Sequence, residues 1–163
     1  LVFEYIYTKY QSGPYNHDRT QNIGDHIAGK DNYYNHSIYN GWQHWGQVIG
    51  NPLYRSPLYN TDNVIDVRNN RFYAIHLGIE GSPTERLDYR MLTTYQKGWG
   101  TYNNPFTKAY KNLSFLVEAK YKFNHNWTVR GGYAMDFGSE KMYGHNAGFQ
   151  LTVTKSGLLT KKK

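Results

Sequence analysis

Apolar and polar residues alternate through most of the second half of the chain. Between positions 113 and 123 the odd-numbered residues are apolar and the even-numbered ones are mostly polar or charged. The same alternation returns between 127 and 137, after the segment Asn124-His125-Asn126. A period of two places alternate side chains on opposite faces of a β-strand. This region therefore predicts two antiparallel strands joined by a tight turn.

Other segments repeat this period and predict further strands. The expected elements are a first strand over 1–10, a hairpin over 71–96 that turns at Gly81-Ser82-Pro83-Thr84, a hairpin over 113–137 and a last strand over 146–156. The expected long connections are 11–70, 97–112 and 138–146. Alternating short and long connections are typical of an up-and-down sheet, and outer-membrane barrels have short periplasmic turns and longer external loops.

The strands favour a membrane barrel. They are about 10 to 11 residues long, which suits a tilted crossing of the bilayer. Trp127 and Phe137 begin and end one strand, where aromatic girdles lie at the membrane interface. We therefore predict an all-β fold, an antiparallel up-and-down transmembrane β-barrel with about six strands in this chain and long external loops. A soluble β-sandwich also alternates apolar and polar residues, so it stays an alternative.

The face opposite the apolar residues carries charged side chains. They are Arg86, Asp88, Arg90, Glu118, Lys120, Arg130 and Asp136. In a barrel they would point into the lumen and pair across strands, where they avoid the cost of about 2–4 kcal/mol for a basic side chain in mid-bilayer. Six strands are too few for a bacterial barrel, because these start at eight strands and tolerate no open edge in lipid. We expect residues 1–163 to be the C-terminal part of one larger outer-membrane barrel domain.

Composition narrows the possibilities further. Seventeen Tyr, seven Phe and four Trp favour strands. The lack of Cys excludes disulfides, thiolate zinc sites and cysteine nucleophiles. A mean hydropathy of −0.80 and the lack of a long apolar run exclude a transmembrane helix. The chain opens within an alternating pattern at Leu1, which predicts a fragment or a processed product.

The net charge of +7 is a weak indication of partners. Lys161, Lys162 and Lys163 supply three of these charges and predict a solvated tail. A nucleic-acid partner is not expected, because it would require a clustered basic face.

The segment 33–53 departs from the strand pattern and carries a resemblance to a known family. It contains Tyr33-Tyr34-Asn35-His36, then Gly41-Trp42 with Gly46 close behind, then Ile49-Gly50-Asn51-Pro52-Leu53. With the paired hairpins and the ending Gly148-Phe149-Gln150-Leu151-Thr152, it resembles the Wzi-type capsule-assembly proteins in their Bacteroidota form. The resemblance implies a protein of the bacterial outer membrane that retains or assembles capsular polysaccharide at the cell surface, without known catalysis.

The aromatic residues of the predicted loops suit carbohydrate. Sugar rings pack their C–H faces on aromatic rings, and Asn and His side chains satisfy sugar hydroxyls. The candidate contacts are Tyr33, Tyr34, Asn35, His36, Tyr39, Trp42, Trp45, Trp99 and Tyr102, and the aromatic residues Phe106 and Tyr110 fit the same description. The expected partners are capsular polysaccharide and outer-membrane lipid.

No enzymatic motif, metal site or cofactor is predicted. The chain lacks the helical His spacing of zinc proteases, the G-x-S-x-G elbow, the P-loop and the dinucleotide fingerprint. A porin-like channel remains an alternative because of the charged lumen, and a soluble β-rich carbohydrate-binding protein is another. A barrel enzyme is a further one, and it would use His17, Asp18, Asp25, His26 and His44.

Overall fold

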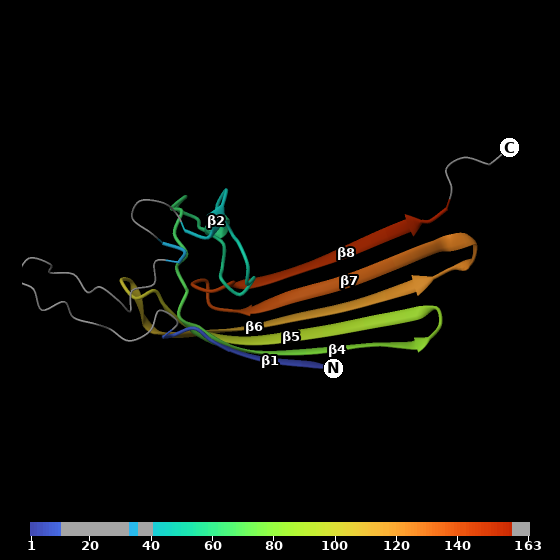
Figure 1. Cartoon of the computed structure of the whole chain (residues 1–163), viewed down its shortest axis with the longest axis horizontal. Helices are drawn as coiled ribbons and strands as arrows, with labels where there is room; N and C mark the ends of the chain where they lie inside the picture. The colour runs from blue at the N-terminus through green and yellow to red at the C-terminus, as the bar shows by residue number, and fades with distance from the viewer. Residues whose placement is uncertain (11–32, 36–40, 158–163) are drawn as a thin grey trace, which may run out of the picture.

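The fold is one six-stranded antiparallel sheet with a folded segment at one end (Figure 1). The computed structural model describes residues 1–10, 33–35 and 41–157. The strands of the sheet are β1 (Val2–Tyr7), β4 (Phe72–Thr84), β5 (Leu87–Gly100), β6 (Pro105–Lys122), β7 (Trp127–Gly138) and β8 (His145–Lys155). They lie in the order β1-β4-β5-β6-β7-β8, so each strand pairs with the next one along the chain. The prediction of an all-β, antiparallel, up-and-down sheet is confirmed.

Short elements complete the described part of the chain. The strands β2 (Gln43–His44) and β3 (Gln47–Val48) form a small hairpin, and the 3-10 helices η1 (Pro57–Tyr59) and η2 (Asn124–Asn126) are one turn each. No helix in the described ranges has the length and apolar character needed to cross a membrane. The β2–β3 hairpin lies within the segment 33–53, where the sequence showed no strand pattern.

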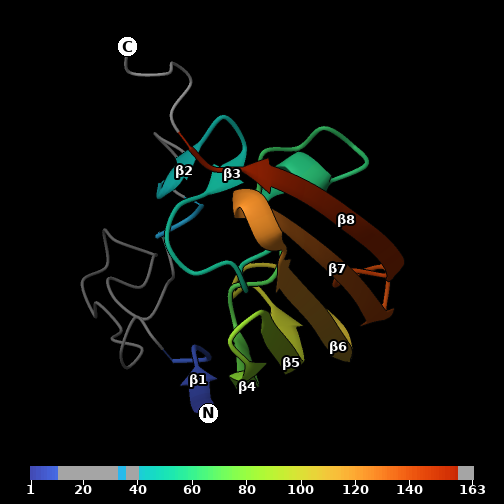
Figure 2. The same cartoon turned by 90° about the vertical axis from the view of Figure 1, so that its right-hand side faces the viewer.

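The strand register keeps residues of one parity on one face across the sheet. One row joins Ile75, Tyr95, Leu113 and Phe137, and the adjacent row on the other face joins His76, Thr94, Ser114 and Asp136. The sheet curves into an arc, and β2 and β3 lie on its concave side (Figure 2). We call the odd-numbered side the outer face and the even-numbered side the concave face.

The connections divide the sheet into two ends. The described parts of the connection 8–71 lie at one end with the connections 101–104 and 139–144, here called the loop end, and Glu85-Arg86 and 123–126 lie at the other, the turn end (Figure 1). The prediction of a long connection over 97–112 is wrong, because β5 continues to Gly100 and β6 starts at Pro105. The turn expected at 81–84 is also wrong: these residues belong to β4, with a register shift between Gly81 and Thr84.

The sheet of the described residues is open. The strands β1 and β8 are its two edges, and neither pairs with another strand in the described ranges. Closure into a barrel is therefore absent from the part of the chain that the structure describes.

Candidate functional site

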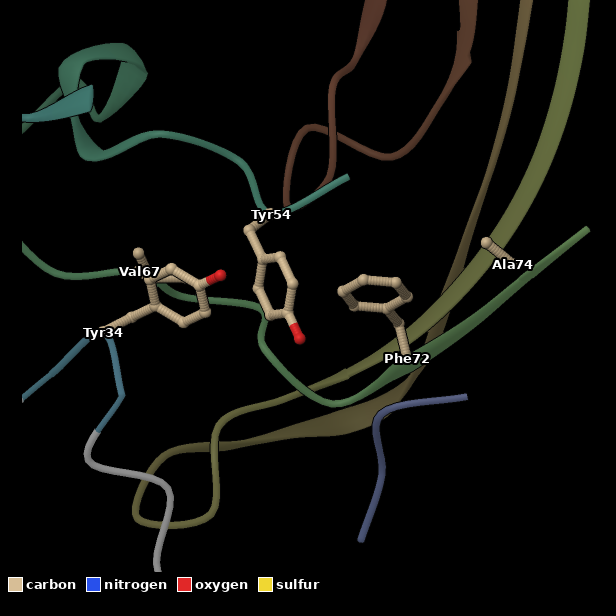
Figure 3. Close-up of a cluster of buried hydrophobic side chains, with 5 residues drawn as sticks. All are labelled: Tyr34, Tyr54, Val67, Phe72 and Ala74. Carbon is tan, nitrogen blue, oxygen red and sulfur yellow. The ribbon is translucent and has the colours of Figure 1, made fainter. Parts of the chain in front are cut away.

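The segment 41–71 folds back onto the concave face at the loop end. Its residues Tyr54 and Val67 form an apolar cluster with Tyr34 and with Phe72 and Ala74 of β4 (Figure 3). The ring of Tyr54 lies 4.4 Å from that of Tyr34 and meets the ring of Phe72 edge-on at 5.0 Å. Because Phe72 and Val67 are fully buried, this cluster is the packed core that holds the segment to the sheet.

Hydrogen bonds from β5 and from the connection 139–144 also hold this segment. The carbonyl of Leu53 accepts a hydrogen bond of 2.9 Å from the side chain of Gln96 in β5 and another of 2.9 Å from the hydroxyl of Tyr143. Burial, reinforced by the charge of Asp136, raises the pKa of Tyr143. The Tyr143 hydroxyl therefore stays a neutral donor at all physiological pH values.

This segment and the neighbouring residue Tyr33 expose aromatic side chains to solvent. The chain turns between β2 and β3 at Trp45 and Gly46, whose φ angles are 50° and 73°. Positive φ angles at both central residues are typical of a type I′ turn in a two-residue hairpin loop. Trp45 is 87% exposed at this turn. Tyr33 and Trp42 are both more than half exposed and stack at 6.1 Å with an interplanar angle of 16°.

We call Tyr33, Trp42 and Trp45 the loop aromatics. The glycine at position 41 allows the backbones next to Tyr33 and Trp42 to approach closely, because a Cβ at this position would lie 2.1 Å from the carbonyl oxygen of Tyr33. The amide of Trp42 also donates a 2.8 Å hydrogen bond to this carbonyl. The stacked pair is thus held by backbone contacts between two chain segments.

Two predicted contact residues have structural roles. Tyr34 is buried in the core cluster. The side-chain amide of Asn35 donates to the carbonyl of Val67 at 2.7 Å and accepts from its amide at 2.8 Å. Both residues anchor the segment and leave the surface to the loop aromatics.

The other predicted contacts are dispersed. Trp99 lies in β5 on the outer face, where its ring meets Tyr73 at 5.9 Å. Tyr102 lies in the connection 101–104, with the Arg71 guanidinium 5.9 Å from its ring. Phe106 and Tyr110 belong to β6, so they are not loop residues. His36 and Tyr39 lie outside the described residues.

The outer face is apolar and uncovered by the rest of the described chain. Lys97 and Lys111 mark the loop-end limit of this face, and Lys155 marks its turn-end limit. Between these limits its described positions carry no Asp, Glu, Lys or Arg. Aromatic rings gather near both limits. The ring of Trp99 meets those of Tyr7 and Tyr73 near the loop end, and Tyr121 and Phe123 meet at 4.7 Å near the turn end. The exposed apolar side chains between these limits include Leu77, Ile79, Met91, Leu113, Tyr133, Phe149 and Leu151.

The concave face holds the strand charges predicted for one side of the sheet. Arg90 donates to Glu118, and Asp88 is 3.6 Å from the ammonium of Lys120 and 3.2 Å from that of Lys122. Asp136 lies nearer the loop end and accepts a 2.5 Å hydrogen bond from Ser114. Arg86 is in the turn between β4 and β5, outside the strands.

Of the residues expected for a barrel enzyme, the structure describes His44 alone. His17, Asp18, Asp25 and His26 lie outside the described residues, and His44 is in β2 with its ring against Trp45. No group of three or more acidic or histidine side chains that could hold a metal occurs in the described ranges.

Sequence reasoning missed the residues that hold the segment 41–71 in place. Tyr54, Gln96 and Tyr143 converge on it from separate parts of the chain, and the strand pattern gave no signal of this. No known protein family, curated protein or solved structure matches the chain.

Proposed function

We propose that the sheet is part of a transmembrane β-barrel of the bacterial outer membrane, with its outer face toward lipid. The observation that carries this proposal is the outer face, which the described residues leave uncovered and whose middle band carries no charged residue, opposite a charged concave face. Soluble monomers rarely expose an apolar patch of more than a few hundred Å². A barrel in a membrane needs apolar outward and polar inward positions in alternation, and this is the pattern on the strands from β4 to β8.

The height of the apolar band supports the same proposal. Trp127 and Phe137 are ten residues apart within β7. At roughly 3.3 Å per residue, this is about 33 Å of strand. A tilt of about 40° reduces it to about 25 Å along the membrane normal, which is the height of the apolar band of outer-membrane barrels.

In the proposed barrel, the open edges of β1 and β8 require further strands as partners. Lipid cannot satisfy the free N–H and C=O groups of β1 and β8. We propose that further strands of a larger barrel close the gap between them. The curvature of the sheet already bends β1 and β8 toward the same side (Figure 2).

We propose that this barrel binds and helps to assemble or retain capsular polysaccharide at the cell surface without catalysing a reaction. The loop aromatics support the binding role, because a rigid, exposed pair of stacked rings beside a displayed Trp offers flat faces to pyranose units. The segment that bears them is the one that resembles the Wzi-type proteins. In this proposal the loop end faces the cell exterior.

The test is the double variant Trp42→Ala/Trp45→Ala in the full-length protein on capsulated cells. We expect capsule retention to fall severalfold while the barrel stays folded, as judged by its heat-modifiable migration on gels. Tyr10→Ala is the matched control, since Tyr10 is an exposed aromatic residue outside this segment. Unchanged retention in the double variant, or equal loss in the control, would contradict the proposal.

A porin-like channel is the second candidate, and the charged concave face favours it. The segment 41–71 argues against a wide pore, because it occupies the concave side at the loop end. Planar-bilayer conductance of the full-length protein separates the two functions. A capsule-binding barrel plugged by this segment should pass little current, whereas a channel should pass a steady ohmic current.

A further inference from the structure

The concave face carries a second feature at its turn end, away from the loop aromatics. A hollow of about 220 Å³ lies over β4, β5, β6 and β7. Its charged lining comprises Glu80, Asp88, Arg90, Glu118, Lys120 and Arg130. The capsule proposal makes no use of these residues.

Two of the three acids of the hollow, Asp88 and Glu118, form ion pairs with basic side chains of β5 and β6. The Glu118 carboxylate accepts a 2.7 Å hydrogen bond from the Nε of Arg90. Asp88 is shared between Lys120 and Lys122. Glu80 lies directly across from Arg90 on the neighbouring strand. Arg130 forms no ion pair with any residue that the structure describes, and it is exposed to the hollow.

The strand register places Arg130 in an electrostatically unfavourable row. Its direct neighbours are Lys120 on β6 and Thr152 on β8. Like charges directly opposite each other destabilise a sheet. A bound anion would remove this repulsion, and the Thr152 side chain adds a hydroxyl donor in the same row.

We propose that this hollow binds an oxyanion group, with Arg130 as the main ligand and Lys120 in support. A guanidinium presents paired N–H donors that match a carboxylate or a phosphate bidentately. The chemical class is therefore a carboxylate, as on an acidic sugar, or a phosphate. This site lies at the opposite end of the sheet from the loop aromatics, and its chemistry does not depend on the capsule role.

The experiment is calorimetric titration of the detergent-solubilised full-length protein with inorganic phosphate and, separately, with glucuronate. Low ionic strength is needed because salt screens exposed charges. We expect binding to the parent protein and a loss of about tenfold or more in Arg130→Gln, the size of a charge-assisted hydrogen bond. Lys108→Gln is the matched control, since Lys108 is an exposed cation at the loop end of β6 and should leave binding unchanged.

A second variant should change the anion affinity in the opposite direction. Glu118→Gln removes a negative charge beside the hollow and releases Arg90, so we expect anion binding to tighten by about threefold or more. Binding of glucuronate alone would assign the site to a sugar carboxylate, and binding of both probes to oxyanions in general. The proposal would be overturned if the parent protein bound neither probe, or if Arg130→Gln and Lys108→Gln weakened binding equally.

Discussion

The outer and concave faces of the sheet are built from alternate residues of the same strands, yet they differ in charge and in covering. The concave face holds the ion pairs of β5 and β6 and is covered at the loop end by the segment 41–71. The outer face carries aliphatic and aromatic side chains and is covered by nothing in the described part of the chain. The alternation thus sorts side chains between two surroundings, while a segment distant in sequence decides which part of one face is buried.

The largest expected effect is the loss of the core contact on the concave face. Phe72→Ala removes a fully buried ring from the cluster around Tyr54 and should cost about 3–5 kcal/mol of the free energy that docks the segment 41–71. Leu77→Ala, on the outer face of the same strand, should leave docking unchanged. Limited proteolysis of 41–71 measures this difference, and equal protection in the two variants would break the contrast between the faces.

A charge placed on each face of one strand tests the contrast directly. Val117 and Leu116 are adjacent, half-buried residues of β6 that point to opposite faces. Val117→Arg should destabilise the protein folded in lipid vesicles by about 2–4 kcal/mol, because in the proposed barrel it would put a cation at mid-bilayer. Leu116→Arg, on the concave face, should cost clearly less. Urea titration in vesicles measures both, and equal costs would count against a lipid-facing outer side.

The covering of the concave face can be tested with two of its glycines. A Cβ at Gly98 would lie 2.3 Å from the side chain of Asn69, which accepts a 3.1 Å hydrogen bond from the amide of Gly100. Gly98→Ala should therefore cost about 1–3 kcal/mol by overpacking. Gly148→Ala meets nothing within 4 Å and should have little effect. Denaturant unfolding compares the two, and similar losses would mean that the loop-end covering is not tightly packed.

The smallest expected effect concerns the pH dependence of the segment over the concave face. Hydrogen bonds from the Arg68 guanidinium and from the amide of Val64 hold the pKa of Asp62 below its ordinary value. This stabilisation is present above the unfolded-state pKa of an Asp side chain, about 4, and is lost as the pH falls through the folded-state pKa. Protease protection of residues 60–68 should weaken at acid pH in the parent protein and less so in Asp62→Asn. The same acid response in both would assign it to another group.

The strands could be predicted because a period of two is a local signal. The alternation around Val117 and Tyr133 gave the antiparallel pairs and the division of charges between the faces. The error at 97–112 has a local cause. Gly98, Gly100, Asn103, Asn104 and Pro105 favour turns, but neighbouring strands extend β5 and β6 around a four-residue connection, 101–104.

The candidate site was harder to predict because its contacts are not local. Aromatic content drew attention to the segment 33–53, but the same residue type is buried at Tyr34 and displayed at Trp42. Only tertiary contacts decide between these roles. The hydrogen bond from Gln96 to Leu53 joins residues 43 positions apart, and no pattern in the sequence encodes it.

Accessibility of spin labels in the full-length protein, reconstituted in lipid, tests the lipid-facing outer side most directly. Labels at Phe115, Val117, Tyr133 and Leu151 should be relaxed strongly by lipid-soluble oxygen and weakly by a water-soluble nickel reagent, and labels at Ser114, Leu116 and Thr152 should show the reverse order. Labels at the first four positions that are shielded from both reagents, as in a protein interior, or relaxed mainly by nickel, would contradict the membrane role and the surface function that depends on it.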